Sequence, residues 1–225
     1  MYFCTKVLIY QSMNKNSISI LLVVFATFII SFTGCKNSSS VNSEQNHSTE
    51  VSNPAYENIM TRTSVRSYTD KLISADTVEM LLRAGMAAPT ARNSQPWHFV
   101  AITDRAKLDE LAETNRHGRM LKEAPLAIAV CGNMDKALEG DGKDYWIQDC
   151  SAATENILLA VNALGLGAVW TGVHPIAERV ESVSKVLNLP ETIIPLSVIV
   201  VGYPNESPQP KNKWLPENVS YNIYE

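Results

Sequence analysis

The amino-acid sequence predicts an α+β domain with no internal repeat. Helical patterns outnumber strand patterns along the chain, and the strand patterns do not recur at a fixed spacing. The chain has 225 residues, of which 45% are apolar and 19% charged, so it can bury a substantial core and lacks the composition of a disordered chain. Together these observations favour one globular domain of mixed helices and strands.

The first predicted elements lie between residues 55 and 113. A short helix is expected over Ala55–Arg62. The helix over Ser74–Ala88 begins at a serine, a good N-cap residue, and carries apolar residues at helical spacing until Pro89 ends it. The turn-forming stretch PTARNSQPW then leads to an alternating strand over His98–Thr103 and a helix over Arg105–Glu113.

The second half of the domain contains the longest apolar and helical runs. The run LAIAVCG follows a proline and fits a buried strand, and the longest helical pattern ends at Gly165 in the manner of a helix stop. The elements predicted here are, in chain order, a strand over 126–132, a helix over Tyr145–Leu164, a short extended stretch over Ala168–Thr171, a helix over Ala177–Leu187 and a central strand over Ile193–Gly202.

The last 23 residues, Tyr203–Glu225, form a tail with four prolines and little apolar periodicity. An irregular segment of this length on a compact domain needs a surface to dock on. A second subunit is one candidate for that surface.

Charge and cysteine content exclude several classes of protein. The formal net charge is −4, which gives no general attraction to nucleic acid or anionic lipid, so no nucleic-acid partner is expected. Four cysteines in 225 residues are too few and too scattered for a disulfide scaffold. They include no Cys-x-x-Cys pair, which argues against a zinc ribbon. An enzyme or a ligand-binding protein remains.

The first 35 residues read as a targeting segment. They carry Lys6 and Lys15 but no acid, and an uncharged apolar run of sixteen residues, Ile18–Thr33, is short for a membrane span. The run ends in FTGC at Cys35, and a Ser- and Asn-rich stretch follows at once. This pattern resembles a bacterial lipoprotein signal, which implies that Cys35 is lipidated and becomes the new N-terminus.

The N-terminal pattern therefore divides the chain into three parts. Residues 1–35 are the signal and lipidation segment, residues 36–54 a flexible tether, and residues 55–225 the folded domain with its C-terminal extension. An uncleaved anchor helix, with Cys35 an incidental thiol, is the alternative.

Four stretches of the folded part resemble the FMN-dependent nitroreductase family in order and spacing. The first motif is RTSVRSY, Arg62–Tyr68; the second is AAPTARNSQPWHFV, Ala87–Val100; the third is LGLGAVWTGVHP, Leu164–Pro175. GYPNESPQPKNKW near the C-terminus is the fourth. The resemblance runs from about Ala55 to the end. It implies an α/β sandwich with a central, mainly antiparallel sheet flanked by helices.

Cationic and hydroxyl side chains of the first motif fit a flavin phosphate. Arg62 and Arg66 lie four residues apart, and a guanidinium binds phosphate in bidentate fashion. Ser64 adds a hydroxyl donor between them. The resemblance implies that this segment contacts the phosphate and pyrimidine of FMN, and that Lys211 and Lys213 bring a further basic pair to the phosphate. The family's usual arginine is replaced by lysine at the second of these positions.

The resemblance also implies contacts of the second motif from a partner subunit. Pro89, Thr90 and Asn93 occupy the positions at which the family's partner chain touches the flavin. The Asn93 amide offers both a donor and an acceptor, as the flavin edge requires.

The third motif and one further arginine are expected near the isoalloxazine ring. Trp170, Thr171 and Gly172 would lie beside the ring, where a backbone N–H could reach N5. Arg119 matches a basic residue that the family often directs at the N1–O2 edge, where a cation would stabilise the reduced flavin.

The expected protein is a homodimer with two FMN sites at its interface. NAD(P)H would pass a hydride to N5, and a nitroaromatic, quinone or similar small-molecule acceptor would follow in ping-pong order; no catalytic side chain is required. A lipid-anchored flavin-binding or electron-carrier protein without nicotinamide turnover is the alternative. Lipidation would place the domain at the periplasm or exterior, where free NAD(P)H is scarce, so a cytoplasmic location is the other possibility.

Overall fold

The computed structural model describes residues 53–114 and 118–224. The predicted signal, Cys35 and nearly all of the predicted tether lie outside these residues. Within them, no helix combines the length and the apolar character that crossing a membrane requires.

The described residues contain five α-helices, which occupy the stretches that the sequence predicted, with ends that differ by at most two residues. Their bounds are α1 Pro54–Thr61, α2 Ala75–Met86, α3 Arg105–Glu113, α4 Tyr145–Ala163 and α5 Ala177–Leu187. Side-chain caps explain the starts of the first three. The side chains of Asn53, Ser74 and Asp104 accept hydrogen bonds from backbone N–H groups of the first helical turns. Helix α5 ends at Asn188, whose φ is 51°, in a left-handed C-terminal turn.

In the described part of the chain, four strands form one antiparallel sheet in the order β1-β2-β4-β3. The strands are β1 Trp97–Ile102, β2 Leu126–Asn133, β3 Gly167–Gly172 and β4 Ile193–Gly202. This arrangement confirms the predicted α+β class and the antiparallel sheet. A register shift opposite Pro195 lets the central strand β4 include a residue without an N–H group.

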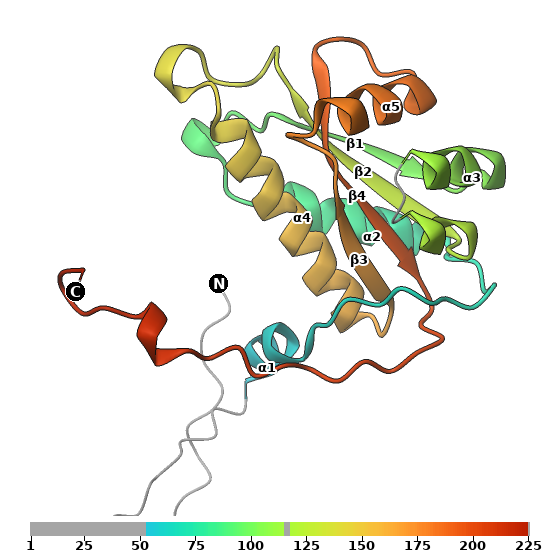
Figure 1. The fold of residues 1–225 in the computed structure, drawn as a ribbon, viewed down its shortest axis with the longest axis horizontal. Helices are drawn as coiled ribbons and strands as arrows, with labels where there is room; N and C mark the ends of the chain where they lie inside the picture. The colour runs from blue at the N-terminus through green and yellow to red at the C-terminus, as the bar shows by residue number, and fades with distance from the viewer. Residues whose placement is uncertain (1–52, 115–117, 225) are drawn as a thin grey trace, which may run out of the picture. The chain divides into compact units, whose positions relative to one another are not determined.

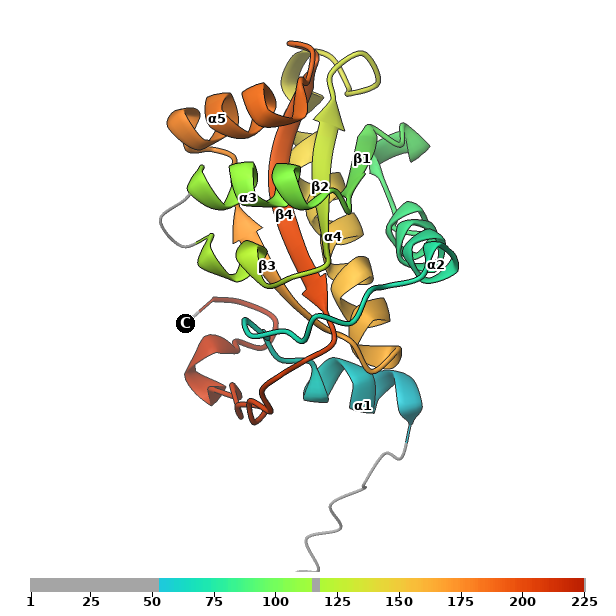
Figure 2. The same cartoon turned by 90° about the vertical axis from the view of Figure 1, so that its right-hand side faces the viewer.

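Helices cover both faces of the sheet (Figures 1 and 2). Alternate residues of β2 separate the two cores: Leu126, Ile128 and Val130 pack with residues of α2 and α4, whereas Ala127 and Ala129 pack with residues of α3 and α5. All five β2 residues have no exposed surface. The sheet is therefore the middle layer of a helix–sheet–helix sandwich.

The strand order decides where the sequence motifs lie. Strand β1 follows the second motif's loop and is one edge of the sheet, and β3, from the third motif, is the opposite edge. Two strands lie between them, so the edges are about 14 Å apart at ~4.8 Å per strand. The second and third motifs are thus held on opposite sides of one subunit.

Candidate functional site

The first motif docks on the outer edge of β3. Ser64 pairs with Ala168 in a parallel bridge, and the Val65 N–H donates to the Ala168 carbonyl at 2.9 Å. Val65 is buried, and it occupies the space beside Gly167. The structure therefore brings the predicted phosphate segment directly against the third motif.

The two arginines of this segment have different surroundings. Arg62 is largely buried, with 20% of its side chain exposed, and its Nε lies 3.3 Å from the Glu155 carboxylate on α4. Arg66 is exposed. Sequence reasoning missed Glu155, because nothing in the helical pattern of α4 indicates which chain segment its side chain meets.

The outer edge of β3 carries backbone groups available to a ligand. The N–H and C=O of one strand residue point to the same side, so the outward Ala168 carbonyl indicates that Trp170 and Gly172 also direct theirs outward. The Gly172 carbonyl accepts a hydrogen bond from the Arg179 guanidinium at 3.1 Å, so at Gly172 it is the N–H that a ligand could use. Trp170 is 36% exposed, and nothing lies within 4 Å of a side chain built at Gly172. The Thr171 hydroxyl donates to the carbonyl of Val198 on the neighbouring strand β4 at 2.7 Å, so its proton is already used in a hydrogen bond within the sheet.

Arg119 lies close in sequence to a hollow beside the third motif. It is an exposed residue of the 3₁₀ turn Arg119–Lys122, and its neighbour Gly118 lines a narrow hollow together with Thr171 and Gly172. The structure thus places the segment of Arg119 on the same side of the subunit as the first and third motifs.

The start of the tail is fastened to the first motif. Tyr68 pairs with Pro204, the Thr69 N–H donates to the Tyr203 carbonyl at 2.9 Å, and the Asn205 N–H donates to the Ser67 carbonyl at 2.9 Å. The buried Tyr68 hydroxyl donates to backbone carbonyls of the first motif and of β4, and burial raises the pKa of this phenol above its usual value.

A tail carboxylate completes this attachment. Glu206 accepts hydrogen bonds from the consecutive N–H groups of Arg66 and Ser67. Lys211 and Lys213 follow on the exposed part of the tail. Sequence reasoning missed Glu206, although a single acid between the end of β4 and the basic pair was a visible signal.

The second motif lies apart from the other predicted site residues. Pro89 and Asn93 are exposed and Thr90 is half-buried in the loop before β1, at the opposite sheet edge from Trp170. One subunit does not bring these residues to β3. The predicted site residues therefore lie in two groups at opposite edges of the sheet.

The two buried thiols are unreactive by their surroundings. Burial raises the pKa of Cys131 to about 12 and that of Cys150 to about 12. The Cys150 thiol donates to the Cys131 carbonyl at 3.4 Å. The run LAIAVCG was predicted to be a buried strand, and Cys131 lies in that strand with no exposed surface.

Comparison with known proteins gives the same family throughout. The sequence profile of the Nitroreductase family matches residues 59–117 and 111–203. A protein of Methanothermobacter thermautotrophicus, provisionally named an NADH dehydrogenase/NAD(P)H nitroreductase, is 43% identical over 163 residues, which are 72% of this chain and 84% of that protein.

Two solved structures share the fold. A Parabacteroides distasonis protein with the same provisional name has a TM-score of 0.73 and 46% identity, covering 76% of this chain and 99% of that chain. A provisionally named nitroreductase from Desulfovibrio desulfuricans, solved in complex with FMN, has a TM-score of 0.66 and 31% identity, covering 77% of this chain and 99% of that chain.

Proposed function

Because the chain belongs to the nitroreductase family, we propose that it is an NAD(P)H-dependent oxidoreductase that uses FMN. The names of two similar proteins give NADH dehydrogenase or NAD(P)H nitroreductase activity, and one similar structure contains FMN. The observation that carries the proposal is the contact between the first motif and β3, which puts the segment that bears Arg62 and Arg66 beside the outer edge of that strand.

The residues around β3 fit FMN. Arg62 and Arg66 supply cations for a phosphate, and Ser64 supplies a hydroxyl. The outward N–H groups of Trp170 and Gly172 supply donors for a ring edge, and the lack of a side chain at Gly172 permits close approach. Bound FMN supplies the hydride chemistry, so these residues need only bind the cofactor, orient it and donate hydrogen bonds to it.

For the reaction, we propose a ping-pong order in which two substrates use the same exposed face in turn. Reduced nicotinamide binds first and leaves oxidised, and a nitroaromatic, quinone or similar acceptor then takes its place. Arg119, near the third motif, would favour the negatively charged reduced cofactor electrostatically.

The separation of the motifs supports a homodimer. Pro89, Thr90 and Asn93 lie on the sheet edge opposite Trp170, and a second copy could bring both groups of residues to one cofactor. The exposed tail offers large apolar side chains to such a partner, among them Trp214 at 64% and Tyr221 at 81% exposed. We propose two sites per dimer, each built from both chains.

Flavin content and turnover test the proposed function together. The purified protein should be yellow or bind added FMN, and it should oxidise NADH or NADPH with menadione or a nitroaromatic as acceptor. A protein that holds FMN but oxidises neither nucleotide would instead be the flavin-binding or electron-carrying alternative. A protein that binds no FMN would contradict both proposals.

For location, we propose that residues 1–35 direct export and that Cys35 carries a lipid anchor at the periplasmic or exterior side. The FTGC boundary and the polar stretch after it support this proposal. The anchored domain would then need a reductant other than free cytoplasmic NAD(P)H, whereas a cytoplasmic protein would not.

A further inference from the structure

Asp149 is a buried carboxylate for which the proposed chemistry has no use. It lies on α4 and is 6% exposed. Its Oδ1 accepts a hydrogen bond from the Ala91 N–H at 2.9 Å. Its Oδ2 is buried and has no hydrogen-bond partner among the described residues. Burying a carboxyl oxygen without a hydrogen-bond partner costs free energy, so the presence of Asp149 at this position needs a physical explanation.

The loop that Asp149 contacts has an unusual backbone. Arg92, Asn93 and Gln95 have φ values of 53°, 54° and 50°, in the left-handed region that residues other than glycine rarely adopt. Three such residues in four positions cost free energy. A strained backbone of this kind is stable only where contacts with the surrounding structure hold it in place.

Local hydrogen bonds close the loop but do not attach it to the domain. The Asn93 N–H donates to the Thr90 carbonyl at 3.1 Å, and the Gln95 N–H donates to the Thr90 hydroxyl at 3.2 Å. Among the described residues, Asp149 is the side chain from outside Pro89–Gln95 that hydrogen-bonds to this loop. The bond goes to Ala91, which lies between Thr90 and the first left-handed residue.

We infer that Asp149 is a positioning residue that fixes the loop Pro89–Gln95 and thereby directs Thr90 and Asn93 toward the flavin. The inference rests on the proposed function, because that function gives the loop its ligand. The link from Asp149 to the loop does not depend on FMN and can be measured without it.

Hydrogen exchange at the Ala91 amide tests the link directly. Asp149→Leu keeps the branched shape of the side chain and removes the acceptor, whereas Asp149→Asn keeps an acceptor oxygen. Loss of the acceptor should speed Ala91 exchange about 10- to 100-fold in D149L, whereas D149N, whose amide oxygen still accepts, should show a smaller increase. Asp149→Ala gives the same comparison if the leucine variant does not fold.

A variant on the same helix controls for general destabilisation. Thr154 is fully buried on α4, and its hydroxyl lies 3.2 Å from the Ser197 hydroxyl. Thr154→Val should lower the melting temperature without altering Ala91 exchange, FMN affinity or the visible circular dichroism of bound FMN. In contrast, D149L should weaken FMN binding about tenfold and change that dichroism.

The outcomes separate this inference from the proposed function. Wild-type Ala91 exchange in D149L, or D149L and T154V behaving alike, would overturn the positioning role. Faster exchange with unchanged FMN affinity and dichroism would also overturn it, because the loop would then not present groups to the flavin. A wild-type protein without FMN affinity would contradict the proposed function, while Ala91 exchange would still decide the link between Asp149 and the loop.

Discussion

Val65 occupies the space that a side chain on Gly167 would need. A Cβ at Gly167 would lie 2.7 Å from the Val65 Cβ, closer than real Cβ contacts allow. The contact joins the first motif to the start of β3, next to the hydrogen bond from Val65 to Ala168. The small residue at Gly167 is therefore needed for the close packing of Val65 against the start of β3.

Gly167→Ala should therefore damage both stability and FMN binding. Val65 is β-branched and has few alternative rotamers, so the first motif must shift away from β3. Overpacking of this kind costs about 1–3 kcal/mol of unfolding free energy. We expect a lower urea midpoint and weaker FMN binding, the latter measured by fluorescence titration.

Gly165→Ala is the matched control for this variant. Gly165 has a φ of 68°, and a side chain there meets no atom within 4 Å. The substitution should destabilise the fold through backbone strain and leave FMN affinity unchanged. Equal loss of FMN affinity in both variants would show that Val65 does not transmit the effect.

Local signals account for the elements that the sequence predicted well. Ala177–Leu187 and Ile193–Gly202 have the bounds that their helical and apolar patterns indicated, and Ser74 caps α2 as expected. These features depend on residues close together in the chain. Periodicity and capping chemistry are sufficient to find them.

Long-range contacts account for what the sequence could not predict. Glu155 meets Arg62, Glu206 meets the Arg66 N–H, and Asp149 meets the Ala91 N–H, each across many residues of chain. Each partner is set by tertiary packing, and no local pattern encodes it. The positions of the motifs on opposite sheet edges likewise follow from the strand order rather than from any one segment.

Alanine at both Arg62 and Arg66 should reduce FMN affinity strongly. Each charge-assisted bond to the phosphate contributes about 1.5–3 kcal/mol, or roughly a 10- to 100-fold change in Kd. The Arg62–Glu155 ion pair is partly exposed and contributes little to stability by itself, so the double variant should remain folded. Fluorescence titration with FMN measures the decrease in affinity.

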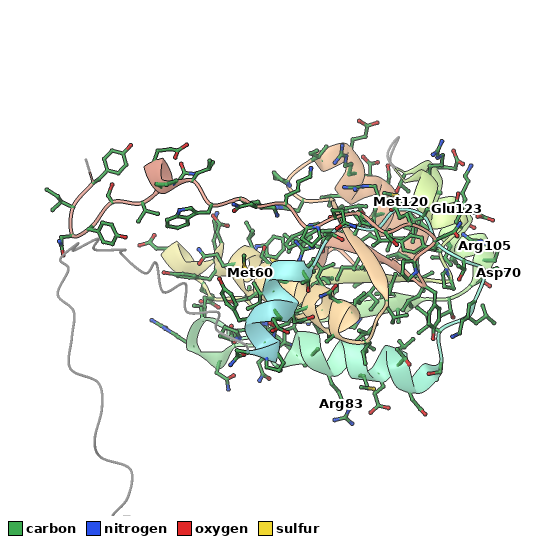
Figure 3. The ribbon with its side chains drawn as sticks, turned by 90° about the horizontal axis from the view of Figure 1, so that it is seen from below. Met60, Asp70, Arg83, Arg105, Met120 and Glu123 are labelled. Atoms are coloured by element: carbon green, nitrogen blue, oxygen red, sulfur yellow. The ribbon has the colours of Figure 1, made fainter. Side chains whose placement is uncertain are left out.

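Arg83→Ala controls for removal of a surface cation. Arg83 projects from α2 to solvent (Figure 3) and pairs there with Glu79 at 2.6 Å. Its removal should leave FMN affinity unchanged. A double Arg62/Arg66 variant that purifies fully yellow, with the affinity of R83A, would show that the phosphate binds elsewhere.

Stability should fall in alkaline solution because two thiols are buried. The ordinary pKa of 9.0 rises to about 12 in the fold for Cys131 and Cys150, so above pH 9 the unfolded chain loses protons that the native state retains. Ionisation of each thiol in the unfolded chain should lower the free energy of unfolding by about 1.4 kcal/mol at about pH 10. The two thiols together should lower it by roughly 3 kcal/mol.

Urea unfolding under reducing conditions checks this pH dependence. Cys131→Ala with Cys150→Ala should be less stable near neutral pH, because the smaller side chains leave space in the core, but should lose less stability as the pH rises. Tyr68, whose pKa is also raised by burial, contributes equally to both proteins, so the difference between their slopes isolates the thiols. Equal slopes would contradict the assignment.

Cys35→Ser should release the protein from membranes if Cys35 is lipidated and the signal is still cleaved in the variant. Stable membrane anchoring needs more than one acyl chain, and C35S removes the residue that would carry them. The variant should therefore move to the soluble fraction when the expressing bacteria are fractionated. Metabolic labelling with a fatty acid would confirm the modification in the wild type. Equal membrane retention of C35S would favour the uncleaved anchor, and wild-type protein in the cytosol would contradict export.

Truncation after Ser207 should remove the dimer and lower FMN affinity together. The cut keeps Glu206 and its bonds to the first motif, so the folded core should retain its stability. It removes the exposed aromatic residues Trp214, Tyr221 and Tyr224, which no surface of the same subunit buries. Light scattering on the protein from residue 53 onward gives the mass, and visible absorbance gives the flavin content.

Lys211→Ala with Lys213→Ala separates the two roles of the tail. This variant keeps the aromatic residues, so it should remain dimeric, while FMN affinity falls about 10- to 100-fold for each lysine that binds the phosphate. The truncated protein should have a still lower affinity, because a monomer presents Thr90 and Asn93 on the edge opposite β3. A truncated protein that stays dimeric and yellow would show that the tail does not hold the subunits together. A full-length monomer with normal FMN affinity would exclude a site built from both chains.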